Sequence, residues 1–134
     1  MKKLLFPLVC LMFVFSSCKK YEDGPGFSLR SKTARVAGEW KVEKQIENGQ
    51  DLPLTPDDKD DTWVFKKDGT YEIQDPGNST ESGTWVFDSK KENIIISEKS
   101  FGISITMKIL RLTNKEMWLE YSFGTDKSEL HLMQ

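Results

Sequence analysis

Residues 62–73 read Thr-Trp-Val-Phe-Lys-Lys-Asp-Gly-Thr-Tyr-Glu-Ile, and this stretch predicts a β-hairpin. Its first four residues are the β-branched and aromatic types that pack well in strands. Asp68-Gly69 tolerates the positive φ of a tight turn. Tyr71 and Ile73 then alternate with polar residues, as in a strand with one buried face. The hairpin therefore indicates antiparallel pairing between strands that are neighbours in the sequence.

The same pattern continues on both sides of this hairpin, from residue 38 to the last residue. Turn-forming residues interrupt the chain roughly every 8–12 residues, a spacing typical of an all-β sandwich or barrel. No stretch after residue 35 shows a helical period. The predicted strands are Gly38–Ile46, Thr62–Lys66, one led by Tyr71 and Ile73, Gly83–Phe87, Asn93–Ser97, Ile103–Leu112, Met117–Phe123 and one marked by Leu130 and Leu132.

These segments predict an all-β fold of about eight antiparallel strands. A closed up-and-down barrel is favoured over a sandwich, because closure removes the exposed strand edges. Along the first strand, Trp40, Val42, Lys44 and Ile46 are expected to share one face. In the whole domain, the alternation of apolar and polar residues predicts which side chains face the barrel interior. These are Trp40, Trp63 or Phe65, Tyr71, Trp85, Phe87, Leu119 and Tyr121. Trp118 has the opposite parity and is expected to face outward.

The N-terminus has the order of features found in a bacterial export signal. Lys2 and Lys3 precede an apolar run over residues 4–15, too short to span a bilayer as a helix. Phe15-Ser16-Ser17-Cys18 follows and resembles a bacterial lipoprotein box. That resemblance implies cleavage before Cys18 and a lipid on its thiol. The alternative is an ordinary secretory signal followed by a free thiol.

The chain is therefore divided into three parts: a signal peptide over residues 1–17, an acylated tether over 18–35 and a barrel domain over 36–134. Cys10 would leave with the signal, so Cys18 would be the sole mature cysteine. Within the tether, Phe27 and Leu29 are either incidental apolar residues or contacts to the domain. The lipid anchor implies a cell-envelope protein, and the expected membrane is the outer membrane.

Three short motifs carry a resemblance to a family. Gly38-Glu39-Trp40 opens the first strand, Phe65 to Tyr71 encloses the Asp-Gly turn, and Gly83-Thr84-Trp85 opens a later strand. Together they resemble small lipocalin-like lipoproteins of Gram-negative bacteria. The resemblance implies a lipocalin-like (calycin) barrel with Gly38 and Trp40 in structural roles. Two departures are a short domain and the lack of an arginine near the end of the last strand.

Charge and composition exclude several function classes. The chain has 19 basic and 21 acidic residues, and its acidic body argues against a nucleic-acid partner. Its single histidine, His131, is expected on an outer strand face, and there is no zinc spacing, phosphate loop or nucleophile elbow. Residues 51–61 hold five aspartates, but their spacing is not that of a calcium loop. No enzyme activity, metal or cofactor is therefore predicted.

The aromatic content favours a binding protein for a small hydrophobic ligand. Tyr71, Trp85 and Tyr121 are the predicted ligand contacts, because they lie in different strands with inward parity. The open end should be framed by the longest loops, residues 47–60 and 75–80. An acidic domain favours neutral or cationic apolar molecules over anionic ones. The alternative is a filled barrel that acts as a protein-interaction or hydrolase-inhibitor module with an envelope partner.

Overall fold

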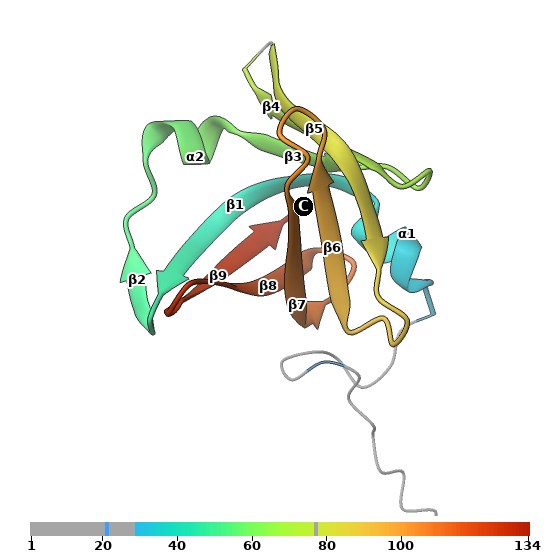
Figure 1. Ribbon diagram of the computed structural model, residues 1–134. Coiled ribbons are helices and arrows are strands. Elements are labelled where there is room, and N and C mark those ends of the chain that lie inside the picture. Colours follow the sequence, from blue (N-terminus) through green and yellow to red (C-terminus); the bar gives the residue numbers. More distant parts are fainter. Residues whose placement is uncertain (1–20, 22–28, 77) are drawn as a thin grey trace, which may run out of the picture.

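The computed structural model describes residue 21, residues 29–76 and residues 78–134, which form a β-barrel with two short helices (Figure 1). The helices are α1 (Lys32–Val36) and α2 (Pro56–Asp60). The strands are β1 (Gly38–Glu47), β2 (Gln50–Leu52), β3 (Thr62–Phe65), β4 (Thr70–Asp75), β5 (Asn78–Phe87), β6 (Asn93–Glu98), β7 (Ser104–Leu112), β8 (Glu116–Phe123) and β9 (Asp126–Met133).

The strands form one antiparallel up-and-down sheet that closes on itself. Strands β3 to β9 follow one another in sequence order, and β1 pairs with β3 on one edge and with β9 on the other. Short β2 pairs with the last residues of β1 on the same edge as β3, so it extends the barrel wall at its rim. The prediction of a barrel of about eight antiparallel strands is confirmed.

The two ends of the barrel differ. At the end called here the closed end, α1 packs across the opening, and Arg35 Nη1 donates a hydrogen bond of 2.8 Å to the Leu112 carbonyl. The turns at this end are residues 66–69, 88–92 and 113–115. At the open end lie the long β1–β3 connection with β2 and α2, and the turns that join β4 to β5, β6 to β7 and β8 to β9. Figure 1 shows α1 and α2 on opposite sides of the barrel.

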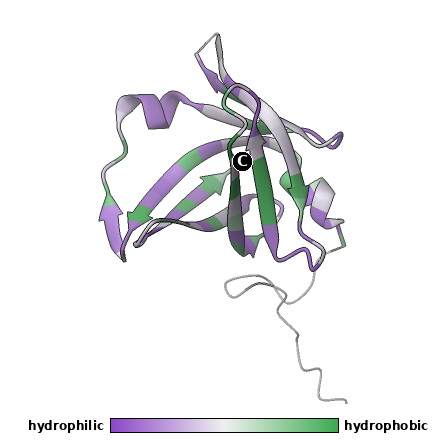
Figure 2. Ribbon diagram, in the orientation of Figure 1, coloured by the Kyte–Doolittle hydropathy of each residue, from purple (hydrophilic) through white to green (hydrophobic). Residues whose placement is uncertain are grey.

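The core fills the closed half of the barrel. Val36, Trp40, Leu112, Met117 and Leu132 are completely buried there. Figure 2 shows hydrophobic residues along β6, in contrast to the hydrophilic surface of α2 and β2. Most residues predicted to face inward belong to this core. The buried ones are Trp40, Phe65, Tyr71, Trp85 and Leu119. The half-buried ones, which pack against the core, are Trp63, Phe87 and Tyr121.

Two expectations about local structure are wrong. A β-bulge between Val42 and Lys44 reverses the alternation of β1, so Lys44 pairs with outward-facing His131 and leaves the inner face. A helix also occurs after residue 35, because Thr55 and Asp58 form a capping box around α2 and Pro56 begins it. Five residues are too few to produce a helical period in the sequence.

The segment before β1 also contacts the domain. Leu29 is 92% exposed, so it does not dock, and Phe27 lies outside the described residues. Tyr21 is buried instead and donates a hydrogen bond of 3.0 Å to the Lys91 carbonyl. Across the described part of the chain, the helices are too short and too polar to cross a membrane.

Candidate functional site

The open end provides a cleft because β7 and β8 separate there. These strands pair only from Lys108–Glu120 to Leu112–Met117. Toward the open end, the first part of β7 stays paired with β6, and the last part of β8 stays paired with β9. The two parts therefore diverge, and a cleft of about 530 Å³ lies between them.

Four large apolar or aromatic side chains line this β7–β8 cleft, among six polar or charged residues. Ile103 and Ile105 come from β7 and the turn before it, while Tyr121 and Phe123 come from β8. Their exposed fractions are 55% for Ile103, 37% for Ile105 and 82% for Phe123, which is high for large apolar residues. Such a cluster of exposed apolar side chains marks a binding surface more often than a lone apolar residue does.

A second cleft continues from the first around Tyr121 and Phe123, which line both. Its volume is about 330 Å³, and its other walls come from β1, β2 and β9. Residues that pair across neighbouring strands point to the same face of the sheet. Gln45 of β1 pairs with the core residue Leu130 on one side and with Leu52 of β2 on the other, so Leu52 faces the inside of the rim. The two clefts together form one continuous concave surface at the open end, with Tyr121 and Phe123 between them.

The fold is that of a known family. A family model of the lipocalin-like domain matches residues 36–119. This chain belongs to the lipocalin-like family. A comparison with curated proteins gave no match. The lipocalin-like barrel is a fold of the ligand-binding type, and its members are typically non-catalytic. The family match ends within β8, whereas the barrel needs β9 to close.

Carboxylates dominate the open end of this lipocalin-like domain. The connection between β1 and β3 contains Asp51, Asp57, Asp58, Asp60 and Asp61 against a single lysine, Lys59. Partial burial, together with the charges of nearby aspartates led by Asp75, raises the pKa of Asp61. Hydrogen bonds from Thr55 lower the pKa of Asp58. Within the described residues, no three of these or other acidic, His or Cys side chains form a group that could hold a metal.

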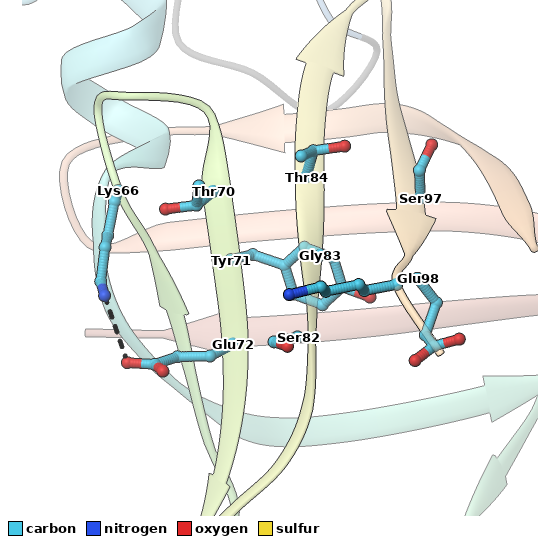
Figure 3. A pocket seen from close by; sticks show the side chains of 10 residues that line it. Lys66, Thr70, Tyr71, Glu72, Ser82, Gly83, Thr84, Ser97 and Glu98 are labelled. Carbon is cyan, nitrogen blue, oxygen red and sulfur yellow. Dashed lines mark ion pairs between the residues drawn. The ribbon is translucent and has the colours of Figure 1, made fainter. Parts of the chain in front are cut away.

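Another cleft of the lipocalin-like domain lies on β4, β5 and β6, with a volume of about 590 Å³ (Figure 3). Tyr71 forms its floor, and Lys66 pairs with Glu72 at 3.4 Å on its edge. A Cβ at Gly83 would lie 2.0 Å from the Ser97 carbonyl oxygen and 2.9 Å from the Tyr71 ring, so only glycine fits there. Its walls carry mainly hydroxyl and charged groups, which suit an apolar ligand poorly.

The three predicted ligand contacts do not meet in one cavity. Tyr121 lines both clefts of the open end. Tyr71 is 2% exposed, and its hydroxyl donates to a Glu81 carboxylate oxygen at 2.5 Å. Burial and this carboxylate raise the pKa of Tyr71. Trp85 packs edge-on against Phe65 and Phe87 in the core.

Two residues that line the β7–β8 cleft, Ile103 and Phe123, were not predicted as ligand contacts. Each is next to a turn glycine in the sequence. An apolar residue beside a turn cannot reach the core, and this signal could have identified both.

The predicted structural residues lie together at the closed end. Trp40 is completely buried, and its Nε1 donates to the Val36 carbonyl of α1 at 2.8 Å. Gly38 starts β1 with a φ of 151°, a conformation that other residues rarely adopt. Helix α1 therefore covers the tryptophan in this lipocalin-like domain, where the family pattern would place an arginine of the last strand.

The outward face of β7, β8 and β9 carries a row of stacked side chains. Trp118 alternates with buried Met117 and Leu119 and stacks on His131, with ring centroids 4.2 Å apart. Trp118 pairs with Arg111 of β7 on one side and with His131 of β9 on the other. The guanidinium carbon of Arg111 lies 5.3 Å from the centre of the Trp118 ring. His131 Nε2 also lies 3.2 Å from Glu129 Oε2. These contacts hold His131 on the outer face of the barrel.

Proposed function

We propose that this chain is a cell-envelope lipoprotein whose lipocalin-like barrel binds a small hydrophobic ligand in the open-end clefts, without a catalytic step. The observation that carries this proposal is the β7–β8 cleft, where Ile105, Tyr121 and Phe123 present apolar surface beside an opening in the barrel wall. Burial of such surface by a ligand is favourable at roughly 25 cal/mol per Å².

The charge of the open end supports a neutral or cationic apolar ligand. The carboxylates of the β1–β3 connection surround the rim, and Glu47 and Glu129 line the second cleft. An anionic head group at the rim would meet like charges, which disfavour binding. The hydroxyl groups of Tyr121 and Ser128 can orient a polar end of the ligand while apolar side chains cover its body.

Fluorescence titration tests the ligand site. The mature chain without its acylated Cys18, which starts at residue 19 and is soluble, should bind the neutral apolar probe N-phenylnaphthylamine saturably, and its anionic sulfonated analogue more weakly. Ile105→Ser should weaken binding of the neutral probe about 10-fold, because it removes apolar contact worth about 1.4 kcal/mol. Val86→Ser is the matched control, because Val86 is 57% exposed on another part of the wall. Equal weakening by both variants, or no saturable binding, would contradict the ligand site.

Metabolic labelling tests the lipid anchor. Cells grown with a radioactive fatty acid should label the full chain, whereas Cys18→Ser should carry no label. Equal labelling of both proteins would show that Cys18 is not the acylated residue. Fractionation of the labelled cells would then place the protein in the outer or the inner membrane. We expect the outer membrane, because Lys19 and Lys20 follow Cys18 where an aspartate would favour inner-membrane retention in some bacteria.

A protein-interaction module is the second candidate function. Phe101 and Phe123 are both 82% exposed at the open end, and the core fills the closed half of the barrel. A protein partner or a foreign hydrolase would cover both rings, whereas a ligand inside the clefts would contact Phe123 and spare Phe101, which lines neither of them. Loss of probe binding in Phe123→Ser but not in Phe101→Ser would favour the ligand.

A further inference from the structure

The closed end of the barrel combines two features that the ligand site does not use. Its surface is basic, and the segment that leads from Cys18 is fixed to it at Tyr21. We propose that this closed end is a membrane-facing surface that rests on anionic phospholipid head groups and directs the open-end clefts away from the bilayer. This inference rests on the lipid anchor of the proposed function.

Tyr21 fixes the start of the chain to the closed end. Its ring belongs to the buried core cluster, and its hydroxyl donates to the Lys91 carbonyl in the β5–β6 turn at 3.0 Å. The Lys32 ammonium of α1 lies 5.4 Å from the centre of the same ring. These contacts hold Tyr21 between a turn and a helix that both belong to the closed end.

Covalent geometry then limits the distance between the barrel and the lipid. Cys18 precedes Tyr21 by three residues, and a fully extended chain spans at most about 3.3–3.6 Å per residue. The Cα atoms of the two residues are therefore at most about 11 Å apart. An acyl anchor on Cys18 would hold Tyr21 within about one Debye length of the head groups, which is about 10 Å at 0.1 M salt, so part of the charge attraction remains unscreened.

The charges at the two ends have opposite signs. The last residues before β1 and the turns of the closed end contain only Asp68, Asp88 and Glu92 as acidic residues among those described. The basic residues of the same segments are Arg30, Lys32, Arg35, Lys66, Lys67, Lys90, Lys91 and Lys115. The carboxylates of the open end would be repelled by an anionic bilayer, so both ends favour the same orientation.

Energy transfer from the protein to the bilayer tests this orientation. The full acylated chain is reconstituted in phosphatidylglycerol vesicles that contain an acceptor lipid. A donor dye is placed at Asn114→Cys in the closed end or at Thr125→Cys in the open end, both exposed turn positions. The closed-end dye should transfer more energy than the open-end dye. Equal transfer from both positions, or greater transfer from the open end, would overturn the proposal.

Two pairs of variants separate the causes. The closed end is in equilibrium between contact with the bilayer and orientations away from it. Replacing Lys67, Lys90 and Lys115 by Gln should shift this equilibrium away from contact about fivefold per lysine, because each charge contributes about 1 kcal/mol at an anionic surface. The same exchange at Lys59, Lys99 and Lys127 is the open-end control and should not shift it. Tyr21→Ala should lower transfer from the closed-end dye, whereas Tyr21→Phe, which keeps the packing, should lower it less.

Separate measurements test the membrane-facing surface and the ligand site. Vesicle flotation reports whether the chain is acylated, and a chain that does not float would overturn both the anchor and the orientation. N-phenylnaphthylamine binding by the mature chain is measured without vesicles. If the probe binds and both dye positions transfer equally, the ligand site stands and the membrane-facing surface is rejected. If the closed-end dye transfers more energy and no probe binds, the membrane-facing surface stands and the ligand site is rejected.

Discussion

At the scale of single residues, Trp40 is the largest completely buried side chain, and its indole joins β1 to α1. Trp40→Ala should destabilise the mature chain by about 3–5 kcal/mol, because it opens a cavity under the helix. Thermal unfolding monitored by circular dichroism measures the change. The melting temperature of Trp40→Phe should lie between those of the wild type and Trp40→Ala, because phenylalanine keeps most of the packing and loses the hydrogen bond to the Val36 carbonyl. An unchanged melting temperature in Trp40→Ala would contradict this role.

A second residue, Tyr21, makes the docking of the N-terminal segment dependent on pH. Burial is the main cause that raises the pKa of Tyr21 from 10.0 to about 12. Since the docked pKa lies above the undocked one, docking is at full strength below pH 10 and weakens as pH rises from about 10 to 12. Spectrophotometric titration of the mature chain should show a component near pH 12 from Tyr21, separate from that of Tyr71, whose pKa is also raised. That component should be absent from Tyr21→Phe, and its persistence would assign it to another tyrosine.

At the scale of elements, α1 belongs to the barrel although it precedes the first strand. Val36 is completely buried, and Arg35 bonds the carbonyl of Leu112 at the end of β7. A chain that starts at residue 37 should therefore be less stable than one that starts at residue 29, by at least the roughly 1.5–3 kcal/mol of a hydrogen bond to a charged group. Urea unfolding of the two chains measures the difference. Equal midpoints and slopes would show that the helix adds nothing.

At the scale of the whole molecule, closure by β9 removes the free edges of β1 and β8. A chain that ends at residue 125 should expose both edges and should aggregate, because unpaired strand edges recruit other strands. Size-exclusion chromatography of the soluble fraction measures this loss. Asp51→Pro is the control, because it disturbs only the exposed rim strand β2. A monomeric truncated chain would contradict the need for closure.

Sequence reasoning succeeded where short-range rules apply. The Asp68-Gly69 hairpin and the alternation of β4, β5 and β8 predicted an antiparallel barrel and its inward aromatic residues. It failed at the β1 bulge, because one extra residue reverses a period of two and leaves no local sign. It also placed three ligand contacts in one cavity, whereas Tyr71 and Trp85 lie in the packed half of the barrel and Tyr121 lies at the rim.

The sequence by itself determined the all-β strand content and the order of antiparallel neighbours, because both depend on residues close together in the chain. Lipid attachment at Cys18 stays a prediction from the sequence. Only the tertiary structure decided where β7 and β8 part, since that follows from the register of β7 with β6 and of β8 with β9. Only the fold also gathered the basic residues of three separate turns and α1 at one end. Contacts between distant residues set both features, and no local pattern encodes them.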